Sequence, residues 1–173
     1  MEDVIVRKAT IKDVNRIADI KIEGWQTSYR GILEDAFLDN MNRDVEISKR
    51  KDDIENENNI FVAEVEGNIV AFCLYRDYIK DTEIYPNYDC EISSLYVTNS
   101  FKRKGIGKKL MKKVIKYLKE QGKSKMILGC LKDNYPSRAF YEKMGGKIIK
   151  IDQIEFGNKK YDLAIYEYNI TEM

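Results

Sequence analysis

Residues 102–108, read as Lys-Arg-Lys-Gly-Ile-Gly-Lys, place two glycines among four cations just before a segment with helical spacing of apolar residues. Glycine is costly inside a helix, so it is worthwhile mainly where the backbone bends unusually or approaches a ligand closely. The first amides of a helix have no acceptor within the helix, and the helix dipole is positive at that end. Gly105 and Gly107 would let a phosphate reach these amides. The sequence therefore indicates an anion site at this turn.

Two common phosphate-binding loops do not fit the turn. A Walker loop requires Gly-x-x-x-x-Gly-Lys-Ser/Thr, which the sequence lacks, and a dinucleotide fingerprint requires a third small residue where Leu110 stands. Taken alone, the Gly-x-Gly pattern is equally typical of a tight turn before a solvated basic helix. The surrounding residues must decide between the two interpretations.

Composition excludes several other classes of site. The 173 residues contain no histidine, and the three cysteines form no Cys-x-x-Cys pair, so we expect no metal site and no histidine-based triad. Cys73, Cys90 and Cys130 lie in apolar runs and are interpreted as buried structural thiols. The formal net charge is only +1, so bulk charge favours no nucleic-acid partner.

The chain as a whole indicates one domain over residues 1–173. No internal repeat, low-complexity tract or linker divides it. The first residues contain no apolar signal core, and no segment approaches membrane-spanning length. We therefore expect a cytoplasmic protein with no membrane partner.

The elements that must position the turn alternate between strands and helices. Runs rich in β-branched and aromatic residues predict strands over residues 4–7, 60–65, 69–75, 91–97, 125–131, 147–153 and 160–169. Helical spacing and capping residues predict helices after Thr10-Ile-Lys-Asp13, over residues 34–41 and 44–54 (both exposed), from Ile106 to Gly122, and over residues 136–144. The result is an α/β (α+β) fold in which helices cover the faces of a mixed sheet.

Three motifs at compatible spacing enclose the turn. They read Glu91-Ile-Ser-Ser-Leu-Tyr-Val97, Lys102-Arg-Lys-Gly-Ile-Gly107 and Asn134-Tyr-Pro-Ser-Arg-Ala-Phe-Tyr-Glu-Lys-Met-Gly145. Together, over about residues 90–146, they resemble the GNAT superfamily of acetyl-CoA-dependent N-acetyltransferases. The resemblance implies a mixed, mostly antiparallel sheet with helices on both faces, which splays into a V between the strands at residues 91–97 and 125–131.

The resemblance also implies how acetyl-CoA would be held as co-substrate. The preceding strand would pair with pantetheine, the amides of the turn would bind the pyrophosphate, and Asn134 would face the cofactor arm. The residues implied in cofactor binding are Leu95, Tyr96, Val97, Lys102, Arg103, Lys104, Gly105, Ile106, Gly107, Lys108, Asn134 and Ser137. Gly146 replaces an aromatic residue of the family pattern, and we expect this to loosen packing beneath the site.

Tyr141 and Glu91 are the implied catalytic residues. A phenol with a pKa near ~10 is protonated at neutral pH, so Tyr141 would protonate the departing thiolate; its alternative role is to pack its helix against the sheet. Glu91 stands where the family carries a general base, but an ordinary carboxylate lies about six pKa units below an amine. A water relay, a raised pKa of Glu91, capture of the rare neutral amine, or a merely solvated acid at this position all stay open.

The acceptor site is less defined by the sequence. The resemblance implies that Trp25 and Tyr29 wall the amine site, although a core tryptophan and a loop tyrosine fit equally well. A group of acids on a long loop would attract a cationic amine, or would simply be solvated. These acids are Asp77, Asp81, Glu83 and Asp89. Gly129 stands where family members that act on ribosomal-protein amino termini carry an acid, so that substrate is disfavoured. The expected partner is a small-molecule amine, which is favoured, or a peptide amine.

The resulting hypothesis is an N-acetyltransferase that acts by direct attack of a primary amine on acetyl-CoA in a ternary complex. Two alternatives are a non-catalytic acyl-CoA-binding module and a nucleic-acid- or ribosome-binding protein that uses the basic residues 102–125. A homodimer formed through the carboxy-terminal strand is a further possibility.

Overall fold

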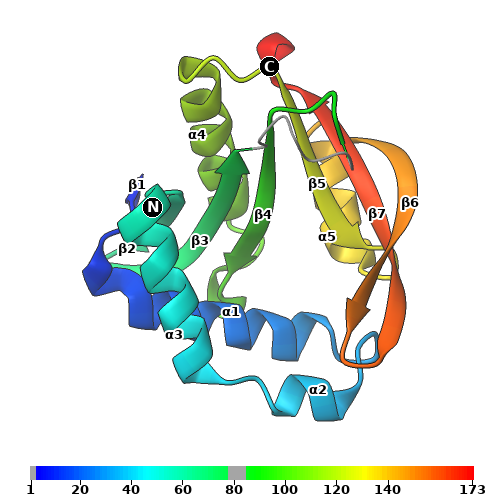
Figure 1. Ribbon diagram of the computed structural model, residues 1–173. Coiled ribbons are helices and arrows are strands. Elements are labelled where there is room, and N and C mark those ends of the chain that lie inside the picture. The colour runs from blue at the N-terminus through cyan, green and yellow to red at the C-terminus, as the bar shows by residue number, and fades with distance from the viewer. Residues whose placement is uncertain (1–2, 78–84) are drawn as a thin grey trace.

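A seven-stranded sheet forms the centre of the molecule, with strand order β1-β2-β3-β4-β5-β7-β6 (Figure 1). The computed structural model describes residues 3–77 and 85–173. The strands are β1 (Val4–Lys8), β2 (Ile60–Val65), β3 (Asn68–Asp77), β4 (Cys90–Val97), β5 (Lys125–Leu131), β6 (Lys147–Phe156) and β7 (Lys159–Asn169). Neighbouring strands are antiparallel except β4 and β5, which are parallel. The expected mixed, mostly antiparallel sheet is confirmed.

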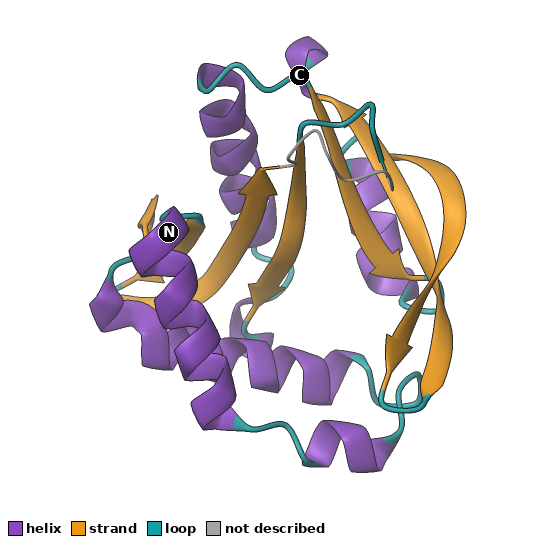
Figure 2. Ribbon diagram, in the orientation of Figure 1, coloured by secondary structure: helices purple, strands orange, loops and turns teal. Residues whose placement is uncertain are grey.

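Helices cover both faces of this sheet, as expected (Figure 2). They are α1 (Val14–Ser28), α2 (Asp35–Asp39), α3 (Arg43–Asp52), α4 (Ile106–Glu120) and α5 (Tyr135–Lys143). α4 and α5 pack against one apolar cluster and α1 against another, with the sheet between them. Because β2 and β3 contribute alternate residues to each cluster, both strands are almost continuously apolar.

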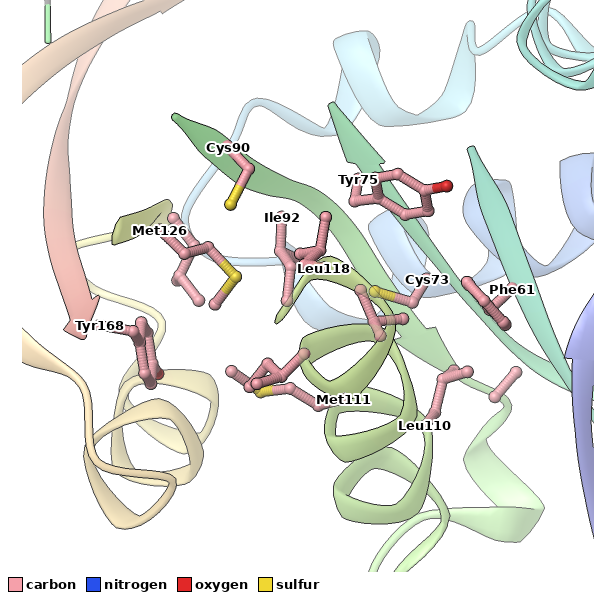
Figure 3. Close-up of a cluster of buried hydrophobic side chains, with 14 of the residues drawn as sticks. Phe61, Cys73, Tyr75, Cys90, Ile92, Leu110, Met111, Leu118, Met126 and Tyr168 are labelled. Atoms are coloured by element: carbon pink, nitrogen blue, oxygen red, sulfur yellow. The ribbon is translucent and has the colours of Figure 1, made fainter. Parts of the chain in front are cut away.

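The segment from Ile106 is the most regular helix, and its apolar side packs on the sheet. Figure 3 shows Leu110, Met111 and Leu118 of α4 pointing toward Cys73 and Met126 of the neighbouring strands. All five side chains are less than 2% exposed. The apolar spacing read from the sequence therefore gives the correct buried face.

α3 differs from the exposed helix that the sequence indicated. Glu46 and Arg50 are only 7% and 5% exposed. Glu46 Oε2 lies 3.0 Å from Lys21 Nζ of α1, and Arg50 Nε lies 2.9 Å from Asp53 Oδ2. Charged residues are rarely buried unless they are paired, so a charge-rich sequence concealed this internal ionic network.

β4 and β5 separate soon after they meet. They pair only at Cys90 with Met126, at Glu91 with Ile127 and at Ile92 with Leu128. Beyond Ile92, β4 follows β3 as far as Val97 while β5 follows β7. β3 pairs Leu74 with Ser94 and Tyr75 with Ile92, so Ser93 is the extra residue of a β-bulge, which increases local twist. The expected V-shaped splay is confirmed.

The carboxy-terminal strand does not end the sheet. β7 lies between β5 and β6, with hydrogen-bonded neighbours on both sides. The idea that this strand pairs across a dimer is therefore wrong, because the edge strands of the described sheet are β1 and β6.

Tyr168 fills the space beneath Gly146, where the sequence suggested loose packing. A Cβ on Gly146 would lie 2.6 Å from Tyr168 Oη and 2.9 Å from the carbonyl oxygen of Tyr141. Tyr168 Oη donates a hydrogen bond to that carbonyl at 2.7 Å, and Tyr168 is 2% exposed. A tyrosine from β7 thus takes the place of the missing aromatic residue, and the expectation of loose packing is wrong.

This contact predicts the effect of a methyl group at position 146. Gly146→Ala lowers the free energy of unfolding by about 1–3 kcal/mol, because Tyr168 or the end of α5 must shift. Urea denaturation followed by circular dichroism measures the change. Gly107→Ala is the matched control and is at least as stable as wild type, since its Cβ would meet Phe140 and Val97 at an ordinary 3.6 Å and alanine favours a helix over glycine. Equal stability of wild type and Gly146→Ala would contradict the packing described here.

Candidate active site

A cleft of about 1250 Å³ opens where β4 and β5 separate. One wall is β4 from Ile92 to Val97, and the opposite wall is β5 from Leu128 to Leu131. The turn before α4, the first turns of α5 and the end of α1 complete the lining. The separation of two strands therefore creates a site to which residues distant in sequence contribute.

Gly105 gives the turn before α4 its shape. Its φ of +81° lies in the left-handed region, as does the φ of +61° at Arg103. Glycine adopts this conformation without the steric cost that a side chain brings. The first amide that donates to the helix is that of Lys109, which reaches the carbonyl of Gly105 at 3.0 Å. The amides of residues 106–108 precede it and are the orphan donors of a helix start.

Gly107 has a different reason to be glycine. Its φ is not positive, and an added Cβ would make only ordinary contacts within the protein. Neither backbone strain nor a clash therefore requires glycine here. The absence of a side chain at this position leaves open the space next to the helix amides, where a phosphate would approach.

The turn's cations divide into two groups. Lys102, Arg103 and Lys108 line the cleft. Lys104 is outside its lining and lies over the ring of Phe101 at 4.7 Å, while the Ile106 side chain is 3% exposed in the core. Lys104 and Ile106 can therefore contribute only backbone amides to a ligand in the cleft.

Asn134 and Ser137 face the cleft from the start of α5. Asn134 is 7% exposed, and its Oδ1 accepts a hydrogen bond from the Ser137 amide at 3.4 Å. This is an N-cap contact, so Asn134 also fixes where α5 begins. Because Tyr141 lies two turns further along the helix, the cap helps to position that side chain.

Tyr141 lines the cleft from α5, opposite β4. Its ring lies 5.4 Å from the ring of Phe140 and 6.4 Å from that of Tyr166. Burial raises the pKa of the Tyr141 hydroxyl well above its ordinary value, so the group is protonated at neutral pH. No hydrogen bond to this hydroxyl occurs among the described residues, which leaves the proton available to a ligand in the cleft.

Glu91 lies just before the splay, in the part of β4 that still pairs with β5. It is not part of the cleft lining, although Ile92 and Ser93 are. Burial raises the pKa of Glu91, whereas a hydrogen bond from Ser93 Oγ at 3.0 Å and the positive charge of Arg76 lower it. The net result is a carboxylate with a pKa above its ordinary value, one residue from the cleft.

Trp25, Tyr29 and Tyr96 meet at the end of α1 and form an aromatic wall of the cleft. Trp25 Nε1 donates to Tyr96 Oη at 2.7 Å, and the hydroxyls of Tyr29 and Tyr96 are 3.3 Å apart. The rings of Trp25 and Tyr29 meet edge to face at 5.1 Å. The two residues named as a candidate amine wall are therefore brought together with Tyr96.

Sequence reasoning missed Gly24, which makes this arrangement possible. A Cβ at Gly24 would lie 2.7 Å from Cδ1 of Tyr96. Glycine in a helix interior costs roughly 1 kcal/mol relative to alanine, so its presence in the middle of α1 was a signal that something approaches the helix closely. The ring of Tyr96 is what approaches.

Comparison with known proteins agrees with this geometry. The family model described as the acetyltransferase (GNAT) family matches residues 21–146, which include the cleft residues of α1, β4, the turn and α5. The chain belongs to this family. The resemblance read from the three motifs is confirmed, and the protein is an N-acetyltransferase of the GNAT type.

Individual relatives are distant but match most of the chain. The chain is 28% identical over 153 residues to an uncharacterized N-acetyltransferase of Bacillus subtilis, a match covering 88% of this chain and 85% of the relative. It is 25% identical over 165 residues to a spermidine N(1)-acetyltransferase of Thermoplasma acidophilum, covering 91% and 97%. The fold is similar to that of a PaiA N-acetyltransferase from Thermoplasma acidophilum in complex with coenzyme A, with a TM-score of 0.73, 20% identity and coverage of 96% and 99%.

The acids expected to attract an amine are occupied elsewhere or lie outside the described residues. Asp89 accepts hydrogen bonds from the Ser124 amide at 2.9 Å and from the Lys125 amide at 3.2 Å, which holds the start of β5 beside β4. Asp77 pairs with Lys123 at 3.2 Å. Asp81 and Glu83 lie outside the described residues. For Asp77 and Asp89, the interpretation as an amine-attracting loop is wrong because these carboxylates link structural elements.

The three cysteines are buried, as expected. Burial raises the pKa of the Cys130 thiol, which lies on the cleft wall, to about 12. Burial also raises the pKa values of Cys73 and Cys90. All three thiols are therefore protonated at neutral pH and are poor nucleophiles.

No helix in the described ranges combines the length and apolar character needed to cross a membrane.

The reason given for glycine at position 107 predicts a loss of cofactor binding without a loss of stability. Gly107→Ala raises the dissociation constant of acetyl-CoA about tenfold or more, equivalent to ~1.4 kcal/mol, because the methyl group occupies the approach to the helix amides. Isothermal titration calorimetry measures the constant. Lys116→Ala, on the exposed side of α4, is the control and binds like wild type. Wild-type affinity in Gly107→Ala would show that the pyrophosphate lies elsewhere.

Proposed function

We propose that this acetyltransferase moves the acetyl group of acetyl-CoA to a primary amine of a small molecule, by direct attack within a ternary complex. One observation carries the proposal. Three features border one cleft: the edge of β4 that no longer pairs with β5 beyond Ile92, the unpaired amides before α4, and the Tyr141 side chain. An acyl thioester with a pyrophosphate requires this combination of backbone donors and cations.

The residues present fit acetyl-CoA. The amides of residues 103–108 would bind the pyrophosphate, with Lys102, Arg103 and Lys108 adding positive charge. The unpaired edge of β4 at Leu95–Tyr96–Val97 would pair with the amides of pantetheine as an added strand would. When bound, acetyl-CoA supplies the activated acetyl group. A backbone N–H of β4 near the thioester carbonyl would stabilise the developing oxyanion.

Glu91 is proposed to remove the proton from the attacking ammonium group through a water molecule. Its position outside the cleft lining argues against direct contact. Its raised pKa narrows the gap to the amine, which makes proton transfer less unfavourable. Ser93, which hydrogen-bonds Glu91 and also lines the cleft, offers a polar link between them.

Tyr141 is proposed to protonate the departing thiolate of CoA. A phenol that is buried and protonated can donate its proton as negative charge develops on sulfur. Direct transfer is favoured over an acyl-cysteine intermediate because the cleft thiol, Cys130, is protonated and the chain has no histidine to activate it. The non-catalytic alternative loses support because it gives Tyr141 and Glu91 no role.

The acceptor is proposed to be a small amine with an apolar body. Trp25, Tyr29 and Phe156 line its end of the cleft. Among the described residues that line the cleft, cations outnumber acids, and Asp133 is the single carboxylate. Gly129 provides no carboxylate to the cleft, and a side chain there would require the Leu163 side chain to shift, since a Cβ would lie 2.9 Å from Leu163 Cδ2. The spermidine N(1)-acetyltransferase relative suggests a polyamine as a possible acceptor. The described cleft lining, however, has one carboxylate, Asp133, to bind a second ammonium group.

Replacing the proposed acid tests catalysis directly. Tyr141→Phe lowers kcat about 100-fold or more, because the leaving thiolate loses its proton donor. Steady-state kinetics measures kcat, and calorimetry checks that acetyl-CoA still binds. Tyr135→Phe on the same helix is the matched control, since Tyr135 is 65% exposed and outside the cleft lining. A Tyr141→Phe enzyme with normal kcat would remove this residue from the mechanism.

The proposed base predicts a shift of the pH profile. Arg76 lies directly opposite Glu91 in the β3–β4 pair, and its positive charge favours the ionised carboxylate. Arg76→Gln therefore raises the pKa of Glu91 further and moves the acidic limb of kcat/KM to higher pH. Arg43→Gln, which breaks a surface pair with Asp19, is the control and leaves the limb in place. An unmoved limb in Arg76→Gln would exclude Glu91 as the titrating group.

The acceptor proposal predicts a preference between two amines. The enzyme acetylates 2-phenylethylamine with a kcat/KM about tenfold or more above that for spermidine, because an aromatic wall favours an apolar body and not a second charge. Release of free CoA thiol measures both rates. Trp25→Ala reduces kcat/KM for 2-phenylethylamine and so narrows the difference in kcat/KM between this amine and spermidine. A preference for spermidine in the wild type would contradict the apolar acceptor.

A further inference from the structure

β6 ends the sheet and exposes apolar side chains. Among the described strands it hydrogen-bonds only to β7. Ile148, Ile149 and Ile151 are 46%, 40% and 45% exposed. A long edge strand with exposed apolar residues is a template for pairing with another chain, and monomeric proteins usually protect such edges.

The outward-facing backbone groups of β6 can be identified. The Gln153 amide donates to its neighbour Asp152 Oδ1 at 2.8 Å, so this amide points away from β7. Alternate residues of a strand direct their N–H and C=O groups to the same side. Ile151 therefore also presents its N–H and C=O on the edge that no other described strand pairs with.

We propose that β6 pairs antiparallel with β6 of a second copy of this chain, about a two-fold axis at Ile151. In this register Ile151 lies opposite Ile151 of the second copy and exchanges two backbone hydrogen bonds with it. Lys150 then lies opposite Asp152 of the second copy on both sides of the axis, and the regular part of the pairing ends at the bulge between Ile148 and Lys150. Two copies of the seven-stranded sheet become one continuous sheet.

Charge complementarity selects this register. Lys150 and Asp152 lie on the same face of the sheet, because Lys150 Nζ is 3.4 Å from Asp152 Oδ2 and both side chains contact Tyr85. An axis at Lys150 would oppose two lysines, and an axis at Asp152 would oppose two aspartates. Opposite charges facing each other across a pair of strands stabilise it and like charges destabilise it. The axis at Ile151 pairs each charge with its opposite and places the most central isoleucine against its own copy.

The proposed interface lies next to the acceptor end of the cleft. Ile154 and Phe156, on the same strand, line the cleft. Pairing of β6 with a second copy would therefore stabilise one wall of the acceptor site. Each cleft would still be lined entirely by residues of its own chain.

The mass of the full-length protein in solution tests the proposal. Size-exclusion chromatography with light scattering should give twice the mass of the 20.3 kDa chain. Lys150→Asp and Asp152→Lys each place like charges opposite each other, and each should raise the dimer dissociation constant about tenfold or more. The double variant, with Lys150→Asp and Asp152→Lys together, restores opposite pairs and should restore the dimer.

Circular dichroism and acetyl-CoA binding confirm that each variant is folded. A monomeric wild type at high micromolar concentration would overturn the proposal. So would a dimer that survives both single charge reversals, since its interface would then lie elsewhere. Ile151→Lys is an independent check, because it opposes two lysines on the axis and should give a monomer even when the chain is fully folded.

Discussion

β4 and β5 run parallel and hydrogen-bond at three residue pairs, after which the extra residue Ser93 turns β4 toward β3. This early separation leaves one edge of β4 without a strand partner. Unpaired backbone groups are costly when they are buried, so the fold keeps them beside an open cleft that a ligand can fill. Apart from Glu91, Lys104 and Ile106, the candidate catalytic, cofactor-binding and aromatic acceptor residues all border that cleft. The interrupted pairing is thus the constraint from which the rest of the site follows.

The chemistry of the cleft is largely that of the backbone. In the proposed complex, the amides before α4 would bind the pyrophosphate and the edge of β4 would pair with the ligand as a strand does. Side chains act mainly by leaving or filling space: Gly107 keeps the amides accessible, Gly24 admits the ring of Tyr96, and Tyr168 supports the carbonyl of Tyr141. None of these roles depends on histidine, which agrees with a sequence that has none.

Local patterns in the sequence were sufficient for most of the elements and for the turn, whereas the splay was expected only from the resemblance to the GNAT superfamily. Gly-x-Gly before an apolar 3.6-residue repeat predicts a helix start with free amides, and β4 and α5 carry motifs of their own. Long-range contacts were not predictable from local patterns. Asp89 and Tyr168 each bind partners more than 20 residues away in the sequence. Glu46 and Arg50 lie on a helix whose many charged residues suggested exposure, although both are buried. The strand order, in which β7 lies between β5 and β6, is likewise a property of the whole sheet and not of any local segment.

In the proposed complex, acetyl-CoA binds to the backbone at two places, the turn before α4 and the unpaired edge of β4. Amide hydrogen exchange with and without acetyl-CoA measures both directly, residue by residue. We expect slower exchange at residues 104–108 and 95–97 on binding, with little change on the exposed side of α4 at Lys112 and Lys116. Binding that leaves both segments unprotected, or that protects only the exposed side of α4, would contradict the proposed complex.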